Sequence, residues 1–446
     1  MEYTRAIARY VVDFSLDDAP ESLVINVKRL LFDWIGVAIR GSITETGIII
    51  TEFVRALGGR PEATVIGSSI KAPSIHAAFA NGVMSHSIEL DDVDRLALFH
   101  FSPPVVSAAL AVAEQQGCDG KTFLEGITAG CEIMARLAYA INPSHRDRGF
   151  HTTATCGTFG AAVAAGKILG LNQKSMISCL GIAGAQSSGL MEFYGESMQK
   201  RINPGFAARN GVTAALLAKM NFTGADTILE GSRGFCKATS DIYSLEKITE
   251  GLCSKFSIDI EFKPYACARP IHPAIDCALN IREKHKINID EIEEIVVKRH
   301  PTWADYHLIY YPRSFHEAQL SLPFSVAVAL IDGEAFIDQY SEKKITDARV
   351  LNLARKVKVI ADDTLKETVS ASMEIVMRDG AKYEFTVNFP KGSVQNPMTD
   401  EDLKRKFISL TSKVLSQERV NEILKKVKII EGIKNINELS NLLGYY

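Results

Sequence analysis

The sequence lacks the paired cysteines that many metal sites use. None of its eight cysteines belongs to a CxxC pair. This spacing excludes a zinc knuckle and the usual iron–sulfur ligand run. The opening residues, MEYTRAIARYVVDF, show no secretory signal pattern, so we expect reduced thiols and a cytoplasmic protein. The cysteines are Cys118, Cys131, Cys156, Cys179, Cys236, Cys253, Cys267 and Cys277.

Long apolar runs and a strong net charge are also missing. No window of about 18 apolar residues is free of charge, so we expect no membrane span. The formal net charge is -3, so no overall basic field favours a nucleic-acid partner. A composition of 46% hydrophobic and 23% charged residues excludes a mainly disordered chain. The length of 446 residues predicts two domains.

Common cofactor motifs are absent as well. The sequence has no GxGxxG after a predicted strand, no GxxxxGK followed by Ser or Thr, and no GxSxG. These absences count against dinucleotide-binding, P-loop and α/β-hydrolase functions. We therefore expect chemistry without a cofactor.

The first 258 residues have an almost entirely helical pattern. Apolar residues recur at three and four positions in segments such as 21–39 and 102–117, which is the period of a helix face. Ala and Gly crowd several later segments, so we expect interior helices that approach each other closely. Asp119 and Asn172 each precede such a segment and predict helix N-caps.

Near residue 259 the pattern changes. Short alternating segments rich in Val and Ile predict four strands, at 291–300, 354–363, 371–380 and 381–390. Asp379 and Gly380 between the last two predict a hairpin turn with positive φ angles. Helices intervene, so residues 262–394 are expected to form an α+β domain. A helical tail follows, which we expect to pack back on the first domain.

Clustered carboxylates mark the segment HSIELDDVDRLALFH, residues 86–100. Glu89, Asp91, Asp92 and Asp94 permit three interpretations. They form a solvated loop rim, or a site in which they raise one another's pKa and set the ionisation of a histidine or lysine. A divalent metal is the third interpretation, which the absence of an HxH or ExxH pattern disfavours.

A second polar cluster, RDRGFHTTATCG, begins at Arg146. A lone histidine is more often structural than catalytic. His151, however, follows Arg146, Arg148 and the flexible Gly149, and it precedes hydroxyls at a predicted helix start. Free N–H groups beside arginines favour a carboxylate. Cys156 lies among small apolar residues, where a packed thiol is expected.

Two further clusters carry cations. Lys200 and Arg201 precede a helix of small residues, which favours anion binding or proton transfer over an ordinary surface position. The segment EFKPYACARPIHPAID, residues 261–276, stands at the predicted domain junction, where ligand clefts tend to form. Its Tyr265 and His272 are candidate acid and base, and its Lys263 and Arg269 candidate carboxylate clamps. Together the four clusters predict acid–base chemistry on a small anion.

These motifs, in this order, resemble the MmgE/PrpD family over nearly the whole chain. They are ELDDVDR, FHFSPPVVSAALAVAE, GFHTTATCGTFGAAVAAGKILGL, GIAGAQSSGL, KRINPGFAARNGVTAALLA, FTGADTILEGSRGF, KPYACARPIHPAID and FSVAVALIDG. The resemblance implies a mainly α fold: a large all-helical domain of residues 1–261 and 395–446, a smaller α+β lid of 262–394, and a homodimer. It also implies a cofactor-free enzyme related to 2-methylcitrate dehydratase, cis-aconitate decarboxylase and iminodisuccinate epimerase.

The resemblance also assigns site residues. The implied catalytic residues are His100, His151, Lys200 and His272. The implied substrate-binding residues are Glu89, Asp91, Arg148, Arg201, Lys263 and Arg269. No metal ligand is implied.

Three departures from the family pattern alter the expected pocket. Val93 stands where the decarboxylase has threonine, and Phe324 stands where it has tyrosine, so a phenol donor is lost. The dehydratase patterns DDTW and GHPSDNLG are replaced here by residues 91–94 and by a short segment, 100–103. These changes spare the acid–base set.

We expect an acid–base lyase that acts on a small di- or tricarboxylate, first of all a hydro-lyase like 2-methylcitrate dehydratase. The alternatives are a cis-aconitate-type decarboxylase, an iminodisuccinate-type epimerase and a carboxylate-binding protein without turnover. One site supports loss of water, loss of CO₂ or return of a proton, so the sequence leaves the reaction open.

Overall fold

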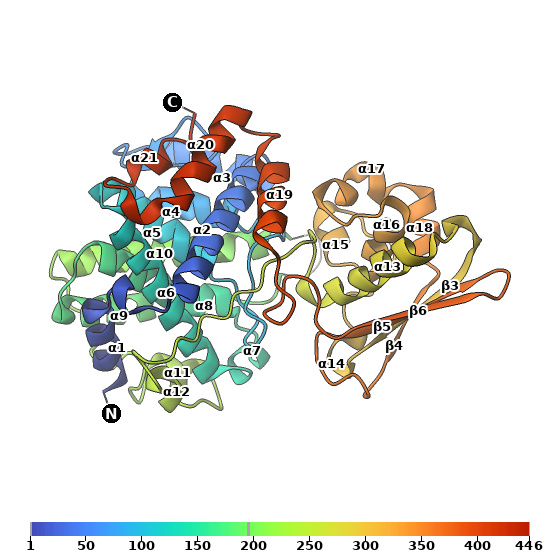
Figure 1. The fold of residues 1–446 in the computed structure, drawn as a ribbon. Helices are drawn as coiled ribbons and strands as arrows, with labels where there is room; N and C mark the ends of the chain where they lie inside the picture. The colour runs from blue at the N-terminus through green and yellow to red at the C-terminus, as the bar shows by residue number, and fades with distance from the viewer. Residues whose placement is uncertain (1, 194–196, 446) are drawn as a thin grey trace.

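The computed structural model describes residues 2–193 and 197–445. With 56% of its residues in helices and 9% in strands, the protein is mainly α with a small α+β part, as predicted. Figure 1 shows a large helical body and, beside it, a smaller part in which helices lie on a sheet. None of the helices in the described ranges is long and apolar enough to cross a membrane.

The helical body is built mainly from the first 249 residues. Its N-terminal helices are α1 (Tyr3–Asp13), α2 (Glu21–Gly41), α3 (Glu45–Leu57), α4 (Ser74–Met84), α5 (Ser102–Gln116), α6 (Gly120–Ile141), α7 (Ser144–Asp147), α8 (Thr152–Ile168), α9 (Gln173–Ala185), α10 (Gln199–Lys219), α11 (Phe235–Thr239) and α12 (Glu246–Thr249). Both predicted N-caps are confirmed. Asp119 accepts a hydrogen bond from the N–H of Thr122 at 2.8 Å, and Asn172 accepts one from Ser175 at 2.9 Å. A short two-stranded pairing, β1 (Ala63–Thr64) with β2 (Lys71–Ala72), was not predicted.

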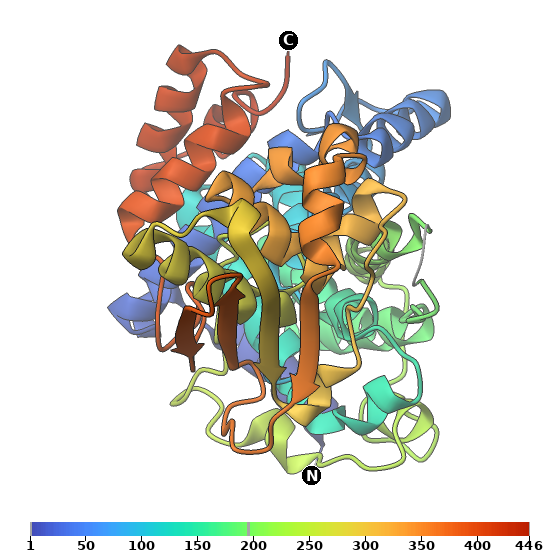
Figure 2. The ribbon, with the colours of Figure 1, turned by 90° about the vertical axis from the view of Figure 1, so that its right-hand side faces the viewer.

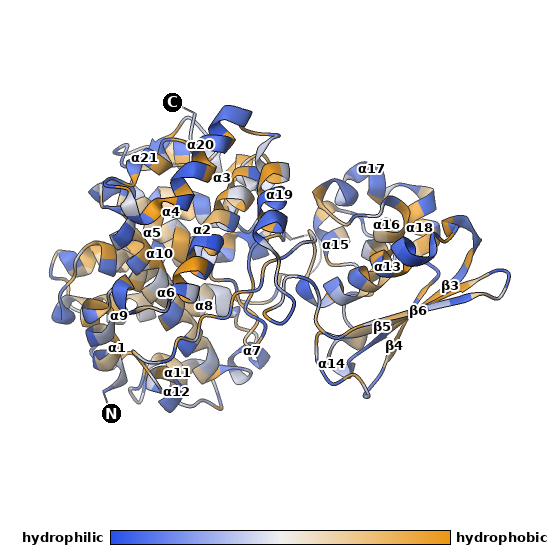
Figure 3. Ribbon diagram, in the orientation of Figure 1, coloured by the Kyte–Doolittle hydropathy of each residue, from blue (hydrophilic) through white to orange (hydrophobic). Residues whose placement is uncertain are grey.

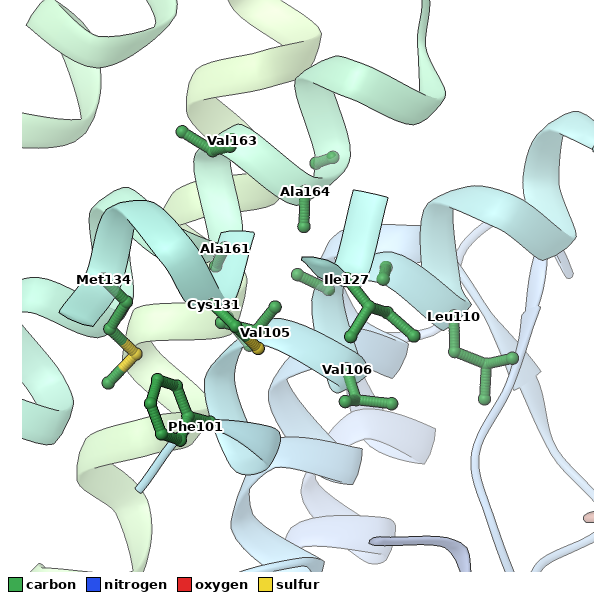
Figure 4. Close-up of a cluster of buried hydrophobic side chains, with 14 of the residues drawn as sticks. Phe101, Val105, Val106, Leu110, Ile127, Cys131, Met134, Ala161, Val163 and Ala164 are labelled. Carbon is green, nitrogen blue, oxygen red and sulfur yellow. The ribbon is translucent and has the colours of Figure 1, made fainter. Parts of the chain in front are cut away.

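Small residues let the inner helices approach closely. A Cβ added to Gly130 of α6 would lie 2.7 Å from the carbonyl oxygen of Gly160 in α8, and one added to Gly160 would lie 2.9 Å from that of Gly130. Val105, Cys131 and Ala161 pack around this contact in the core of α5, α6 and α8 (Figure 4). The start of α8, and therefore His151 in front of it, is thereby placed deep in the body.

The C-terminal tail packs back on the helical body, as predicted. Its helices are α19 (Asp400–Thr411), α20 (Gln417–Lys428) and α21 (Asn437–Ser440), shown in red beside the blue helix α2 in Figure 1. The rings of Phe32 and Phe407 stack with centroids 4.3 Å apart, and Lys406 forms a buried ion pair with Asp33 at 2.7 Å. The outer helices α17 (Glu342–Ile345) and α20 are largely hydrophilic (Figure 3).

The α+β part contains the four predicted strands. They are β3 (Ile292–Arg299), β4 (Val357–Ala361), β5 (Ala371–Met377) and β6 (Lys382–Val387), in the order β4-β3-β5-β6 (Figure 2). β3 pairs with β4 in parallel, and the other neighbours are antiparallel. In the turn before β6 only Gly380 has a positive φ, of 86°, so the expectation for Asp379 was wrong. The Asp379 carboxylate instead accepts a hydrogen bond from the N–H of Ala381.

Helices cover one face of this sheet and complete a second core. They include α13 (His272–His285), α15 (Phe315–Gln319), α16 (Leu322–Asp332) and α18 (Ala348–Ala354), whereas the short helix α14 (Pro301–Ala304) follows the end of β3. α13 packs against β5 and β6. The second core runs from Ala266 to Val387 and is joined by Val37, Ile88 and Leu90 from the helical body. We propose the domain boundaries 1–261 with 395–446, and 262–394, on the basis of these two cores.

Candidate active site

A cavity of about 100 Å³ lies where the helical and α+β parts meet. Six predicted site residues line it: Glu89, His100, His151, Lys200, Lys263 and Arg269. Four others do not: Asp91, Arg148, Arg201 and His272. The clusters at 86–100, 146–157, 198–211 and 261–276 thus converge on one site, although they are far apart in the sequence.

Glu89 is the centre of a cage of cations. Its carboxylate forms ion pairs with Lys200 and Arg201, and with Lys263 at 3.1 Å, and only 1% of the residue is exposed. Burial alone raises the pKa of Glu89, but Lys200, Lys263 and Arg201 together hold it well below its usual range. One carboxylate neutralises one of three cations. The surplus positive charge at the cavity wall favours an anionic ligand.

Asp91 lies behind the cavity and orients His100. Its Oδ2 is 2.7 Å from Nδ1 of His86 and 2.9 Å from Nδ1 of His100. Nδ1 of His100 also lies 2.5 Å from the carbonyl oxygen of Asp92. A carboxylate and a carbonyl only accept hydrogen bonds, so Nδ1 of His100 carries the proton. In the neutral ring Nε2 therefore has a free electron pair, and His100 lines the cavity as a proton acceptor.

His86 is a site residue that the sequence analysis did not single out, although it begins the acidic segment. Its ring lies 4.7 Å from that of His100, and its Nδ1 donates to Asp91. Burial lowers the pKa of His86 to about 4, so the ring is neutral at pH 7. Within the described ranges, the only cluster compact enough for a metal ion is His86, Asp91 and His100, with ligand atoms within 4.8 Å of one another. The contacts of 2.7 and 2.9 Å are hydrogen-bond lengths, so direct hydrogen bonds account for them.

The loop-rim interpretation of the acidic segment is wrong, because all four carboxylate residues are at most 1% exposed. Asp92 accepts hydrogen bonds from the backbone N–H of Phe101 at 2.7 Å and of Ser102 at 3.0 Å, where α5 begins. Asp94 accepts hydrogen bonds from the N–H of Ala97 at 2.7 Å and from the hydroxyl of Tyr139. These two carboxylates hold the loop that carries Glu89 and Asp91.

His151 is the second imidazole of the cavity and stands at the N-cap of α8. Its Nδ1 is 3.0 Å from the side-chain nitrogen of Asn203, which also faces the carbonyl oxygen of Leu190 at 3.4 Å. The amide nitrogen donates, so Nδ1 of His151 accepts and the ring proton is on Nε2. Burial, followed by the charges of His86 and Lys200, holds the pKa of His151 well below its usual range. His151 is therefore a neutral hydrogen-bond donor.

Lys200 and Arg269 complete the cationic wall. Burial lowers the pKa of Lys200 to about 8, although Glu89 opposes the shift. Arg269 donates from Nε to Glu261 at 2.9 Å and from Nη1 to the carbonyl oxygen of Lys391 at 2.9 Å. Its Nη2 is buried and has no hydrogen-bond partner in the described part of the chain. A guanidinium with one unused donor at a cavity wall suits a carboxylate.

His272, which the resemblance implies to be catalytic, does not line the cavity. Its Nδ1 lies 3.0 Å from Nη1 of Arg269, and its Nε2 lies 3.2 Å from the carbonyl oxygen of Cys267. Both ring nitrogens are thus occupied, and His272 holds Arg269 in place. Tyr265, the other candidate acid, donates to Asp276 at 2.5 Å and does not line the cavity.

The two predicted arginines outside the cavity have other partners. Arg148 has an exposed side chain that pairs with Asp241 at 2.9 Å, and Arg146 lines the cavity instead. Arg201 is buried against Glu89 and also donates to Gln319 at 3.4 Å. The spacing of Arg146 and Arg148 in the sequence could not show which of them faces the cavity.

Three other residues have the following positions. Cys156 is buried, and burial raises the pKa of its thiol, as expected of a packed side chain. Val93 lines the cavity, whereas Phe324 is fully buried in the second core.

Two residues of the α+β part, Trp303 and His307, also line the cavity, and no sequence motif indicated them.

Comparison with protein families agrees with this geometry. The model of the MmgE/PrpD N-terminal domain matches residues 5–247, and that of the MmgE/PrpD C-terminal domain matches residues 265–429. The two matches together span most of the chain.

Individual relatives carry lyase names. The cis-aconitate decarboxylase of Aspergillus terreus is 29% identical over 470 aligned residues, which cover 99% of this chain and 96% of the relative. That of Homo sapiens is 28% identical over 458 residues, with 99% and 94% covered. The mitochondrial 2-methylcitrate dehydratase of Yarrowia lipolytica is 23% identical over 434 residues, with 87% and 79% covered. The first expectation from the sequence was a dehydratase. Similarity to these relatives instead favours a decarboxylase.

Proposed function

Because the chain belongs to the MmgE/PrpD family, we propose that it is a cofactor-free lyase that decarboxylates a small tricarboxylate of the cis-aconitate class. One observation carries the proposal: a buried cationic cavity contains two imidazoles with opposite hydrogen-bonding roles. His100 presents an acceptor nitrogen and His151 a donor. The similarity to decarboxylases over almost the whole chain supports the choice of reaction.

The cavity charges suit a substrate with several carboxylates. Lys200, Lys263 and Arg201 share the single charge of Glu89, and Arg269 adds a further guanidinium with an unused donor. An acid with several carboxylates would offset this surplus, whereas a neutral ligand would leave it uncompensated. The cations that line the cavity, and are therefore proposed to touch substrate, are Arg146, Lys200, Lys263 and Arg269.

The proposed reaction is loss of CO₂ followed by protonation. The bond between one carboxylate carbon and its neighbour breaks, CO₂ leaves, and the electron pair that remains on the carbon framework takes up one proton. The fixed cations stabilise the developing negative charge, a contribution that is often about 3 kcal/mol or more per group. His100 is proposed to take up a proton from water on its free Nε2 and to deliver that proton to the carbon, because Asp91 stabilises the positive charge of the ring while it carries two protons. His151 stays neutral and donates a hydrogen bond to a substrate oxygen.

Proton NMR in D₂O tests this function directly. We expect purified protein to convert cis-aconitate to a product that has lost CO₂ and gained one deuteron on carbon. His100→Gln and His151→Ala should each lower kcat by about 10²-fold or more. The matched control is His285→Gln, an exposed histidine of α13, which should retain wild-type turnover. Loss of water from 2-methylcitrate, with cis-aconitate unchanged, would replace the decarboxylase by the dehydratase.

An epimerase, a binding protein and a metal-dependent enzyme would each give a different result. Exchange of the α-proton of iminodisuccinate, without loss of a group, would indicate an epimerase. Thermal stabilisation by these acids without turnover would indicate a binding protein. A loss of activity with EDTA that a divalent ion restores would indicate a metal-dependent reaction at His86, Asp91 and His100.

The proposal includes a cytoplasmic homodimer. The homodimer follows from the family resemblance, and the compartment is consistent with eight cysteines that are all free. Light scattering coupled to size exclusion tests the first statement, and a monomer at micromolar concentration would contradict it.

A further inference from the structure

His307 is a third imidazole at the cavity, and it comes from the α+β part. It follows α14 and lines the cavity together with Trp303, whose ring centroid is 5.9 Å away. His100 and His151 come from the helical body, so the cavity has histidines from both parts of the protein. Nδ1 of His307 is buried and has no hydrogen-bond partner in residues 2–193 and 197–445. A buried, unpaired imidazole nitrogen at a ligand cavity requires an explanation.

The backbone at His307 is held in an unfavourable conformation. Its φ is +65°, in the left-handed region that side chains other than Gly rarely adopt. Its carbonyl oxygen accepts a hydrogen bond from the N–H of Leu322 at 2.9 Å. The conformation is therefore imposed by surrounding contacts, as is common at functional sites.

Arg299 is the main support of this turn. Its guanidinium donates to the carbonyl oxygens of Trp303 at 2.7 Å, Tyr306 at 3.0 Å and Pro270 at 2.8 Å, and only 1% of the residue is exposed. One buried side chain thus ties the His307 turn to Pro270, which lines the cavity next to Arg269. The His307 turn and Pro270 are therefore held at the same wall of the cavity.

Burial keeps the His307 ring neutral. Burial lowers its pKa to about 3, with the cations Arg299 and Lys200 acting in the same direction and Glu89 opposing them. A neutral imidazole offers one donor and one acceptor. The neighbouring cations attract carboxylates, and a carboxylate only accepts hydrogen bonds. The N–H of the His307 ring is therefore the group that can bind one.

We propose that His307 is a specificity-determining residue that donates a hydrogen bond to a carboxylate of the bound acid from the α+β side of the cavity. The inference rests on the proposed function, because it takes the ligand to be a polycarboxylate. The acid would then be held between His307 on one side and His100 with His151 on the other. A molecule too short to reach both sides would bind less tightly.

His307→Gly tests this role without straining the backbone. Glycine adopts a φ of +65° readily, so the variant should fold with an unchanged melting temperature. We expect its Kd for tricarballylate, a saturated and unreactive tricarboxylate, to rise about 10- to 100-fold, as for loss of a hydrogen bond to a charged group. Free imidazole should restore part of the affinity by occupying the vacated space. Asparagine also tolerates this φ and keeps an N–H donor. The affinity of His307→Asn for tricarballylate should therefore fall less than that of His307→Gly.

The controls separate this inference from the proposed function. His285→Asn, on the exposed surface of α13, should leave the Kd unchanged. Wild-type affinity in His307→Gly would overturn the role of His307, even if cis-aconitate is decarboxylated normally. A further outcome is a wild type that binds tricarballylate without decarboxylating cis-aconitate. Weaker tricarballylate binding by His307→Gly would in that case support the role of His307 and reject the proposed decarboxylation. A wild type that binds none of the acids would overturn both.

Discussion

The Nζ atom of Lys406 lies 2.6 Å from the carbonyl oxygen of Leu90, although 316 residues separate the two along the chain. Leu90 stands between Glu89 and Asp91, the two carboxylates that organise the cavity. Lys406 also pairs with Asp33 of α2 at 2.7 Å, and both side chains are 3% exposed. Helix α19 of the C-terminal tail therefore directly supports the loop that carries Glu89 and Asp91.

We expect Lys406→Met to destabilise the protein by about 3 kcal/mol. Methionine preserves the length of the side chain but leaves Asp33 buried without its partner, which is the costly way to break a buried ion pair. Urea unfolding measures the change. Lys404→Met, an exposed lysine of the same helix, should change stability by less than about 0.5 kcal/mol. Equal effects of the two replacements would show that the ion pair has no structural role.

Asn203→Asp should change the proton position on His151. A carboxylate cannot donate to Nδ1, so the ring would move its proton from Nε2 to Nδ1 and would lose its donor toward the cavity. The new negative charge should also raise the pKa of His151. We expect kcat/KM to fall about 10-fold or more, and ¹⁵N NMR of the ring to report the new tautomer.

Asn221→Asp is the matched control for that experiment, because Asn221 is exposed and does not line the cavity. It should retain wild-type activity. An Asn203→Asp variant with full activity would remove His151 as a required donor.

The charge of Lys200 predicts an alkaline limit of substrate capture. Its pKa is lowered to about 8, so the ammonium loses its proton as pH rises through that value. Since carboxylates bind the charged form, kcat/KM should fall above pH 8 in the wild type. Lys200→Arg keeps its charge, so in this variant the fall should move to higher pH. Lys219→Arg, at the exposed end of α10, is the control and should follow the wild-type pH profile. If the profile of Lys200→Arg is not shifted, another group causes the alkaline fall of kcat/KM.

Asp94 predicts a pH dependence of stability. Burial raises its pKa to about 7 from the usual 3.8, despite the hydrogen bond from Ala97. Between these values the native state holds more protons than the unfolded state. The contribution of Asp94 is thus fully present below about pH 4 and is lost as pH rises to about 7.

Asp94→Asn removes this titration. The stability of the variant relative to wild type should therefore rise over the same window, by up to about 1.4 kcal/mol per pH unit, and then level off. Melting temperatures between pH 4 and 8 measure the difference. Asp241→Asn, at an exposed carboxylate, should show a nearly constant difference, and a flat result for Asp94→Asn would contradict the assignment.

Much of the fold could be predicted because it depends on local sequence. Residues 292–299 are rich in Ile and Val and form a strand in which alternate residues from Ile295 to Arg299 are buried, as expected of a half-buried pleated surface. Asp119 caps α6 because its side chain reaches an N–H three residues along. The lone positive φ at Gly380, by contrast, reflects the geometry of one particular turn.

The types of residue in the site could be predicted from the sequence, but the role of each residue could be predicted less well. Glu89, His100 and Lys200 stand in unusual polar clusters, and these do converge on the cavity. His272 appeared equivalent to them from the sequence. Only its contacts with Arg269 and Cys267 show that both ring nitrogens are occupied.

The sequence by itself determined a mainly α protein with an α+β insertion, and a set of histidines, lysines and carboxylates for acid–base chemistry. Only the tertiary structure decided which of them meet, that Arg146 replaces Arg148 at the cavity, and that His86 and His307 belong to the site. The physical reason is that helix period and strand alternation are local properties of the chain. A hydrogen-bond direction or a cation cage depends on side chains that are brought together from distant segments.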